Sequence, residues 1–210
     1  MVTYTLRTLL RSEVIDKVYI VAEPQWREQI AEDAGAFGSN TEKLCGFAAP
    51  GTNRQTSILK GMQRIIEEEC GVLEEGLIPE KDTLLVQDAA RPFLKAGLIE
   101  ECYQALRGHD GVMPVLPMKD TVYRSADGKG VTELLDRTQI YAGQAPELYL
   151  LKKYYRANTA LLPDRIKEIN GATEPAILSG MDVVMIPGDE GNFKVTTAVD
   201  MEKYLSEADL

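Results

Sequence analysis

Residues 83–93 read TLLVQDAARPF, a short apolar run that leads directly into a polar turn. An uninterrupted apolar run of this length is typical of a buried strand in a parallel sheet. We therefore expect a strand from Thr83 to Gln87, with Asp88 and Arg91 just beyond its carboxyl end. In open α/β sheets, ligands bind in the crevice beyond the carboxyl ends of the strands. This turn is the first candidate for a functional site.

Short apolar strands alternate with helices on both sides of this stretch. On its amino-terminal side, the pattern predicts helices over about 3–12, 24–34 and 55–70 and strands over 17–22 and 44–48. On its carboxyl-terminal side, it predicts helices over about 98–106 and 149–162 and strands over 112–116, 181–186 and 192–196. Thr197 and Asp200 have the spacing of a capping box that opens a last helix. This alternation predicts an α/β fold with a Rossmann-like, mostly parallel sheet flanked by helices.

Residues 119–141 interrupt the alternation. Two runs rich in β-formers, Thr121–Arg124 and Val131–Leu134, flank an Asp-Gly pair at 127–128, which is the pattern of a β-hairpin. The hairpin is more polar than the core strands, so we expect it to project from the sheet. A projecting hairpin needs a cover, and a second subunit is the usual one. The pattern therefore predicts a dimerisation arm and a homodimer.

The composition fits one globular domain. Apolar residues make up 44% of the 210 residues and no Pro/Gly/Ser-rich linker divides them, so we expect a single domain over residues 1–210. No apolar run approaches the ~20 residues that a membrane span needs. Arg7, Arg11 and Glu13 lie close together in the amino-terminal segment, unlike in a secretory leader. We expect a cytoplasmic protein with no membrane partner.

Charge and cysteine content exclude other classes. The formal net charge of -10 would be repelled by duplex DNA, so no nucleic-acid partner is expected. A local cluster of Arg and Lys can still hold a small phosphorylated substrate. Cys45, Cys70 and Cys102 are far apart and odd in number, which predicts neither a disulfide framework nor a zinc site. The single histidine, His109, lies in a polar turn and is not expected to carry catalysis.

The chemistry available to Asp88 and Arg91 suits phosphate transfer. A carboxylate there can accept a hydrogen bond from a hydroxyl or help to hold a hydrated magnesium ion, and the planar guanidinium can pair with phosphate. Arg137 and Lys194 are further basic residues in polar surroundings, and with Arg91 they would form a phosphate cradle. The alternatives are an ion pair that ties the loop to the next helix, and solvated charges at the other two positions.

A second candidate is the polar turn at residues 50–57, Pro-Gly-Thr-Asn-Arg-Gln-Thr-Ser, which opens the helix over 55–70. Backbone N–H groups at a helix amino terminus attract anions and acceptors such as a base carbonyl. Plain capping by Thr52, Asn53 or Thr56 accounts for the same residue types. Both interpretations stay open at this point.

From Tyr4 to about Tyr204, the order of these motifs resembles the 2-C-methyl-D-erythritol 4-phosphate cytidylyltransferase family and the related ribitol 5-phosphate cytidylyltransferases. The strongest likeness is Gln-Asp-Ala-Ala-Arg-Pro-Phe at 87–93, against His-Asp-Ala-Ala-Arg-Pro-Phe in the family. Four more motifs follow in family order: Lys119-Asp120-Thr121, Asp136-Arg137, Gly-Gln-Ala-Pro-Glu at 143–147 and Asn-Phe-Lys-Val-Thr-Thr at 192–197. Five motifs in the right order are specific.

The resemblance implies an activity in isoprenoid biosynthesis. CMP would pass from CTP to a sugar or polyol phosphate, with 2-C-methyl-D-erythritol 4-phosphate favoured, and pyrophosphate would leave. Such an in-line reaction needs positioning and charge neutralisation more than a protein nucleophile. Magnesium would be held mainly by the phosphates of CTP, with few protein ligands. The implied catalytic residues are Asp88, Arg91 and Lys194, the implied sugar-phosphate ligands are Thr121, Arg137 and Thr196, and the implied nucleotide ligands are Gly51, Thr52, Arg54 and Ser57.

The sequence departs from the family pattern in two ways. The family begins with a strand and a Gly-rich loop that cradles the triphosphate, whereas this sequence starts near the first helix. We therefore expect a start at an internal Met or a lost upstream segment, a gap in the middle of the sheet, weak CTP binding and little turnover. Smaller departures are Gln87 for His, Thr52 for an acidic residue, and Ala145 and Glu147 for the Thr and Gln of the family. The last two fall near the sugar-phosphate pocket and leave the acceptor open.

Three alternatives compete with this interpretation. Ribitol 5-phosphate is the second candidate for the acceptor. A second class of function is a non-catalytic, dimeric homologue that lacks the triphosphate loop. A nucleotide-sugar glycosyltransferase with a similar sheet would want an Asp-x-Asp metal motif, which the sequence lacks.

Overall fold

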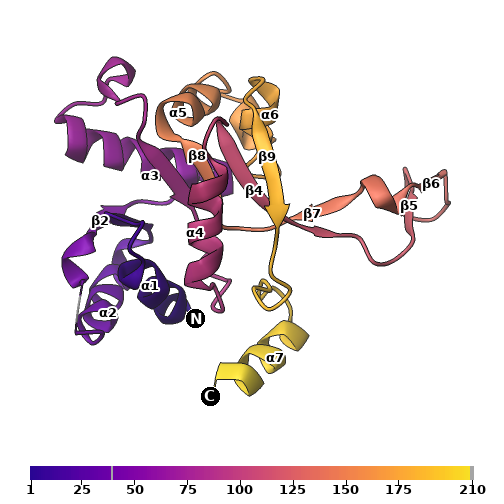
Figure 1. Ribbon diagram of the computed structural model, residues 1–210, viewed down its shortest axis with the longest axis horizontal. Helices are drawn as coiled ribbons and strands as arrows, with labels where there is room; N and C mark the ends of the chain where they lie inside the picture. The colour runs from indigo at the N-terminus through magenta and orange to yellow at the C-terminus, as the bar shows by residue number, and fades with distance from the viewer. Residues whose placement is uncertain (39, 209–210) are drawn as a thin grey trace.

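The computed structural model describes residues 1–38 and 40–208, and it arranges the strands of the body in two sheets between helices, with a third sheet in the projecting hairpin (Figure 1). In the smaller sheet, β1 (Val18–Val21) pairs in parallel with β2 (Leu44–Ala48). The larger sheet has the order β3-β8-β4-β7, with β9 also paired to β4. Its strands are β3 (Thr83–Val86), β4 (Gly111–Pro117), β7 (Tyr141–Gly143), β8 (Glu147–Leu150) and β9 (Val183–Pro187).

Helices cover both faces of these sheets. The α-helices are α1 (Val2–Arg11), α2 (Pro24–Gly35), α3 (Arg54–Cys70), α4 (Ala96–Ala105), α5 (Leu151–Thr159), α6 (Glu174–Leu178) and α7 (Ala198–Ala208). Short 3-10 turns are η1 (Thr41–Lys43), η2 (Glu75–Leu77), η3 (Arg137–Gln139) and η4 (Arg165–Lys167). Within the described residues, no helix is long and apolar enough to cross a membrane.

The alternation of side chains along β3 shows how the core is divided. Leu84 and Val86 pack into a cluster built mainly by α3 and α5, whereas Leu85 packs into a cluster with Cys102 of α4. Successive side chains of a strand point to opposite faces of its sheet, so β3 contributes to the core on both sides. This is the doubly covered strand that the apolar run at 83–87 predicted.

The α/β class, with parallel strand pairs and helices on both faces, is confirmed. The expected mostly parallel arrangement does not hold in the larger sheet, where three of the four described strand pairs are antiparallel: β8 runs against both β3 and β4, β7 runs against β4, and β9 runs parallel to β4. The predicted gap is present: β1 pairs only with β2 and β3 only with β8, so the described strands form no continuous sheet across the molecule.

Two predicted elements are wrong at their boundaries or in type. Tyr149 does not open a helix but lies in β8, and α5 begins only at Leu151. The strand and the helix follow without a polar break, so one apolar run conceals two elements. Residues 192–196 form a loop in place of the predicted strand. Val195 N donates to Ala90 O at 2.8 Å, and a single such bond makes no ladder.

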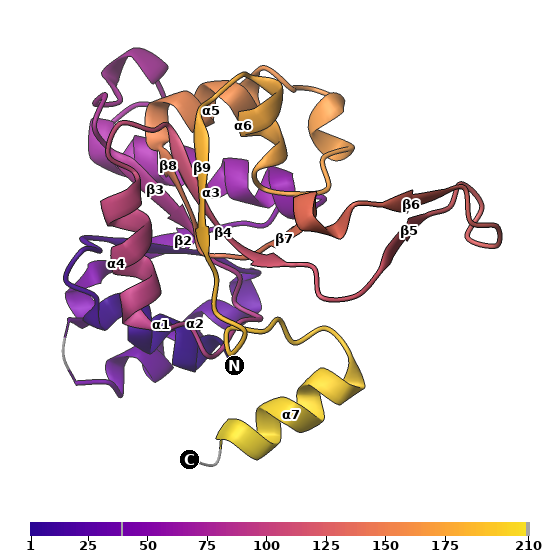
Figure 2. The same cartoon turned by 45° about the vertical axis from the view of Figure 1, so that its right-hand side comes forward.

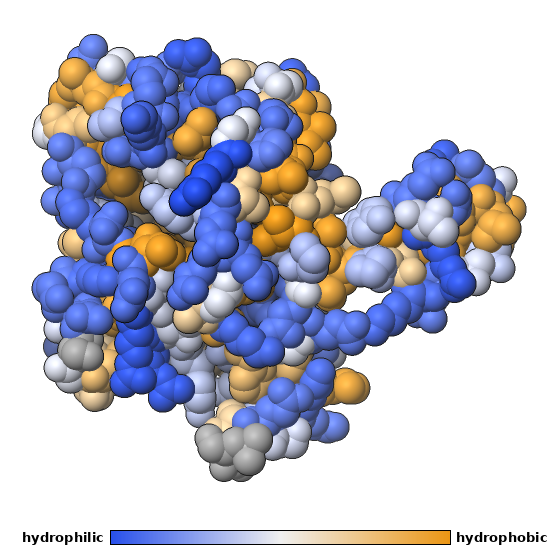
Figure 3. All heavy atoms as spheres, in the orientation of Figure 1, coloured by the Kyte–Doolittle hydropathy of each residue, from blue (hydrophilic) through white to orange (hydrophobic). Residues whose placement is uncertain are grey.

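The predicted hairpin projects from the body as an arm (Figures 1 and 2). Its strands, β5 (Val122–Arg124) and β6 (Glu133–Leu135), pair antiparallel. Figure 3 shows apolar side chains at the tip of the arm, and Val131 and Leu134 are 69% and 63% exposed. The arm therefore carries apolar surface away from the core of this chain.

Candidate active site

Asp88 gathers basic side chains from three segments of the chain. Its Oδ1 accepts hydrogen bonds from Arg54 Nη2 at 2.8 Å and Arg54 Nε at 3.1 Å. Lys194 Nζ lies 3.1 Å from Oδ2, and Arg91 Nε lies 3.7 Å from the same oxygen. The Asp88 side chain is only 15% exposed. The result is a half-enclosed carboxylate surrounded by cations at the carboxyl end of β3.

The turn at 50–57 holds Arg54 in this position. Asn53 caps α3 by accepting from Thr56 N at 2.8 Å, and Thr56 Oγ1 accepts from Asn53 N at 3.0 Å. A Cβ on Gly51 would lie 2.2 Å from Thr56 Oγ1, so the turn needs glycine there. Gly51 N also donates to Ser57 Oγ at 2.9 Å. Capping by Asn53 and Thr56 is thus confirmed, and the same cap aims Arg54 at Asp88.

A buried amide, Gln144, fixes the loop that carries Lys194. Its Nε2 donates to Asp189 O at 2.9 Å, and Asp189 N donates back to Gln144 Oε1 at 3.0 Å. Gly188 lies beside it, where an added Cβ would be 2.9 Å from Gln144 Oε1. The end of β7 and the loop after β9 are thereby joined.

A second buried amide, Asn192, links this loop to the Asp88 turn. Its Nδ2 donates to Ala145 O at 2.7 Å, and its backbone O accepts from Arg91 Nη1 at 2.7 Å. These hydrogen bonds fix the backbone of residues 192–195 beside Asp88. Lys194 is placed by this path, with its side chain 40% exposed to incoming ligand.

The charges in the site are strongly coupled. Burial alone would raise the pKa of Asp88, but Arg54 and Lys194 outweigh it and hold that pKa below its ordinary value. Burial lowers the pKa of Arg91, with Asp88 opposing the shift. Asp88 is therefore an anion at neutral pH that orders the cations around it.

Glu147 is a second carboxylate beside the cluster. It lies on β8 opposite Val86, and its Oε2 is 3.7 Å from Arg54 Nη2. Burial raises the pKa of Glu147 above its ordinary value, and the pull of Arg54 does not cancel that effect. The sequence had marked this residue only as a departure from a family motif.

Several buried polar atoms around the Asp88 turn have no hydrogen-bond partner among the described residues. Among the residues that the structure describes, four buried side-chain atoms without a hydrogen-bond partner belong to the site or lie next to it: Gln87 Oε1, Arg91 Nε, Glu147 Oε2 and Asn192 Oδ1. Buried polar atoms in folded proteins are nearly always paired, with protein, water or ligand. Donors and acceptors clustered about three cations suit a polar, anionic ligand.

A model of the 2-C-methyl-D-erythritol 4-phosphate cytidylyltransferase (IspD) family matches residues 1–208. The chain belongs to this family. It is 31% identical to the 2-C-methyl-D-erythritol 4-phosphate cytidylyltransferase of Rubrobacter xylanophilus over 209 residues, which cover 98% of this chain and 80% of that protein. It is 32% identical over 205 residues to the bifunctional enzyme IspD/IspF of Maricaulis maris, covering 96% of this chain and 48% of that one. The chain thus spans about half the length of such bifunctional relatives.

Solved structures of the IspD family share the fold. The 4-diphosphocytidyl-2C-methyl-D-erythritol synthase of Anaerococcus prevotii superimposes with a TM-score of 0.79 at 22% identity, covering 100% of this chain and 86% of that one. The 2-C-methyl-D-erythritol 4-phosphate cytidylyltransferase of Francisella tularensis gives 0.78 at 19% identity, with 100% and 87% covered. Members of the family are, by its description, cytidylyltransferases and hence nucleotidyltransferases.

Not all residues that the IspD resemblance singles out come together. Arg91 and Lys194 meet at Asp88, but Arg137 lies at the base of the arm, where its Nη1 donates to Lys119 O at 2.7 Å. In the part of the chain that the structure describes, no hydrogen bond or ion pair joins Arg137 to Asp88, Arg91 or Lys194. The basic group around Asp88 contains Arg54 in its place.

The remaining predicted ligands are placed as follows. Thr121 is exposed just before β5, and Thr52 is exposed in the turn before α3. Thr196 donates from both N and Oγ1 to Asp200 Oδ2 at 3.0 Å, so it helps to cap α7. The predicted capping pair is confirmed, since Thr197 N donates to the same oxygen at 2.8 Å and Asp200 N donates to Thr197 Oγ1 at 3.2 Å.

Sequence reasoning missed the direct pairing of Arg54 with Asp88, because it treated the turns at 50–57 and 87–93 as separate sites. It also missed Gln144 and Asn192 as the supports of the Lys194 loop. The sequence did contain a signal for the pairing of Arg54 with Asp88: both turns follow predicted strands of an α/β fold. The carboxyl ends of such strands lie at the same edge of the fold.

Proposed function

We propose that this chain transfers CMP from CTP to 2-C-methyl-D-erythritol 4-phosphate and releases pyrophosphate. The observation that carries the proposal is the half-enclosed Asp88 with Arg54, Arg91 and Lys194 around it, at a strand end in a chain of the IspD family. Nucleotidyl transfer mainly requires that the protein align the phosphates and offset their negative charge. A preorganised group of cations meets that need.

Each group has a role in the proposed reaction. Arg91 and Lys194 bind the reacting phosphates, and Asp88 keeps the cations in place and accepts a hydrogen bond from a substrate hydroxyl. The turn of Gly51, Thr52, Arg54 and Ser57 receives the cytosine base. Thr121, Arg137 and Thr196 are proposed for the sugar phosphate, on the family motif alone.

Magnesium belongs to the proposal as a companion of the nucleotide. Among the described residues, no group of three or more His, Cys, Asp or Glu side chains is arranged to hold a metal ion. Asp88 is the carboxylate nearest the proposed phosphates, and both of its oxygens already face cations. This donor set fits an ion held mainly by triphosphate oxygens, which would offset their negative charge.

We further propose a homodimer formed through the arm. The support is apolar surface on a projecting two-stranded hairpin, which a single subunit leaves in solvent. The cytoplasmic location expected from the sequence remains part of the proposal.

Pyrophosphate release from CTP and Mg²⁺, with each acceptor in turn, tests the activity, and calorimetric binding of each acceptor tests the site separately. Release with 2-C-methyl-D-erythritol 4-phosphate supports the proposal. Release with ribitol 5-phosphate alone transfers the assignment to that acceptor. Neither binding nor release with either acceptor would leave the non-catalytic homologue as the better account.

A further inference from the structure

One oxygen of Asp88 has its hydrogen-bonding capacity filled. Its Oδ1 accepts from both Nε and Nη2 of Arg54, at 3.1 and 2.8 Å. A carboxylate has about four lone-pair sites on its two oxygens, so Oδ1 has no place for a further donor. Oδ2 faces Lys194 Nζ at 3.1 Å and Arg91 Nε at 3.7 Å. A substrate hydroxyl can therefore donate to Oδ1 only when Arg54 withdraws one of its two bonds.

Glu147 offers a second acceptor for that bond. The residue is only 8% exposed, and its Oε2 has no hydrogen-bond partner among the described residues. The same oxygen lies 3.7 Å from Arg54 Nη2. Hydrogen bonds between a guanidinium and a carboxylate are about 2.8 Å long, so Nη2 needs to approach Oε2 by only about 1 Å.

The two carboxylates are held at a fixed spacing. Glu147 on β8 is in register with Val86 of β3, two residues before Asp88, so strand pairing sets the distance between the two backbones. On the side away from Oε2, Glu147 Oε1 accepts from Thr173 Oγ1 at 3.5 Å. This contact leaves Oε2 as the oxygen that faces Arg54.

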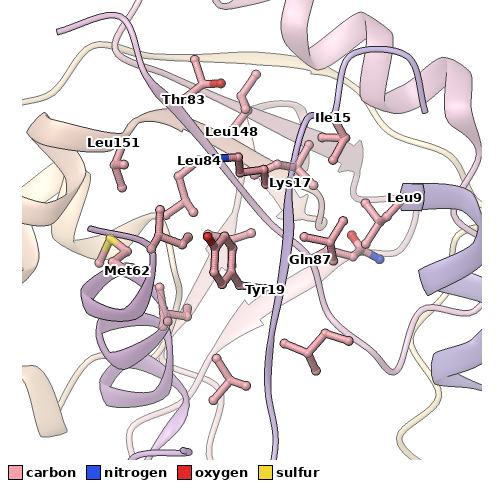
Figure 4. Close-up of a pocket in the computed structure, with 18 of the residues that line it drawn as sticks. Leu9, Ile15, Lys17, Tyr19, Met62, Thr83, Leu84, Gln87, Leu148 and Leu151 are labelled. Carbon is pink, nitrogen blue, oxygen red and sulfur yellow. The ribbon is translucent and has the colours of Figure 1, made fainter. Parts of the chain in front are cut away.

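The Arg54 side chain has room to move between these two acceptors. It is 37% exposed, and its backbone is anchored by the cap that Asn53 gives to α3. Arg54 and Asp88 line part of a cavity of about 830 Å³, and Figure 4 shows Gln87 at the wall of this cavity. The guanidinium is therefore not closely packed on that side, and only the side chain needs to shift.

The charges around Glu147 favour the shift. Burial and the nearby charge of Asp88 raise the pKa of Glu147, and the attraction of Arg54 and Arg91 offsets only part of that effect. The Glu147 carboxylate is thus short of positive charge in the resting site. A closer Arg54 supplies that charge, while Lys194 remains beside Asp88 Oδ2.

We propose that Glu147 is a positioning residue, which takes over Nη2 of Arg54 when a hydroxyl group of the acceptor donates to Asp88 Oδ1. Arg54 then bridges the two carboxylates, with Nε on Asp88 and Nη2 on Glu147. The acceptor phosphate stays with Arg91 and Lys194, so the exchange distinguishes a polyol phosphate from a phosphate without a hydroxyl group. The identity of the ligand rests on the proposed function, whereas the exchange of Arg54 between two acceptors does not.

A double-mutant cycle tests the exchange without ligand. Arg54→Met and Glu147→Gln, singly and together, give the coupling between the two side chains from urea unfolding at pH 7. When Asp88→Ala removes the competing acceptor, this coupling should grow by about tenfold as a factor in the folding equilibrium constant. Asp88→Asn should give a smaller increase, and it serves if Asp88→Ala does not fold. The exposed pair of Arg156 and Glu75 is the control, and its coupling should not change.

Nuclear magnetic resonance titration of the 210-residue chain tests the ligand. The probes are 2-C-methyl-D-erythritol 4-phosphate and methyl phosphate, which carries the same charged group and no hydroxyl arm. Glu147→Gln should weaken binding of the polyol phosphate by about tenfold, because a neutral amide is a weaker acceptor for Arg54 than a carboxylate. Methyl phosphate should bind equally well to the parent and the variant. A purely structural role of Glu147 would not separate the two probes.

Two results would overturn the proposal. One is a coupling between Arg54 and Glu147 that is the same in the parent and in both Asp88 variants, which would mean that Arg54 has a single place. The other is an equal effect of Glu147→Gln on the two phosphates, or no effect on either. If neither phosphate binds the parent, the proposed function fails, and the coupling measured without ligand then decides the exchange on its own.

Discussion

At the scale of single residues, the site is a balance between two carboxylates and the cations they share. Asp88 pairs with Arg54 and Lys194, whereas the buried Glu147 has its Oε2 3.7 Å from Arg54 Nη2 and, among the described residues, without a hydrogen bond. The pKa of Asp88 is therefore lowered from its ordinary value, whereas the pKa of Glu147 is raised. Because the two pKa values shift in opposite directions, a substitution at one carboxyl group can be distinguished from a substitution at the other.

We predict that Arg91→Ala lowers kcat/KM for cytidylyl transfer, or acceptor affinity, by about a hundredfold or more, because it removes a cation aimed at developing phosphate charge. Arg91→Lys should recover little, since the paired N–H groups of the fork are lost. Loss of the bond to Asn192 O should cost only about 1–2 kcal/mol of stability. Arg107→Ala, on an exposed turn, is the control. Activity lost only in proportion to the unfolded fraction would make Arg91 a structural residue.

A second prediction concerns Glu147. Its folded pKa is raised, so its contribution to stability is complete below the unfolded value of about 4.3 and is lost as pH rises through the folded pKa. Glu147→Gln cannot ionise, so its free energy of unfolding should match that of the parent near pH 4 and exceed it at pH 7. Urea unfolding at the two pH values measures the difference. A variant that loses stability as pH rises relative to the parent would show that the Arg54 pairing dominates.

At the scale of elements, the sequence was most informative where a strand or helix is bounded by polar residues. The helix over 55–70 and the strand over 44–48 were predicted almost residue for residue, because their ends carry caps and turns. β8 was hidden, since its apolar residues run on into α5 without a break. The pairing of Arg54 with Asp88 was also hidden, because it depends on which strand ends are neighbours.

The turn before α3 allows a matched pair of substitutions. Gly51→Ala should destabilise the protein by about 1–3 kcal/mol, because the new Cβ would overlap Thr56 at 2.2 Å and 2.6 Å, the latter its backbone carbon. The same substitution should also displace the Arg54 side chain from its hydrogen bonds with Asp88. Gly97→Ala, in the first turn of α4 with nothing within 4 Å, should be neutral or stabilising. Thermal unfolding compares the two, and equal effects would mean that the turn relaxes freely.

At the scale of the whole molecule, the projecting arm and the divided sheet are its two departures from a closed body. The sequence indicated both, the arm through its polar hairpin pattern and the division through its likeness to a longer family pattern. It could not indicate that helices close over the divided region, because that follows from packing between α1, α3 and α4.

We predict that the joint change Val131→Asp and Leu134→Asp converts a dimer into a monomer, since it places charges on the apolar tip of the arm. Ile177→Asp, at a 64% exposed position on α6, is the control and should leave the assembly unchanged. Sedimentation equilibrium gives the mass in each case. A dimer that survives the double change would place the interface elsewhere.

The arm also affects how the molecule moves through water. The hairpin projects from the rest of a 23.2 kDa chain and raises its friction with solvent, so an isolated subunit should sediment more slowly than a sphere of its mass. When two subunits pack their arms against one another, the frictional ratio should fall towards that of a compact particle. The frictional ratio from sedimentation velocity therefore reports whether the arm is held out or packed away, even in a mixture where the mean mass alone would be ambiguous.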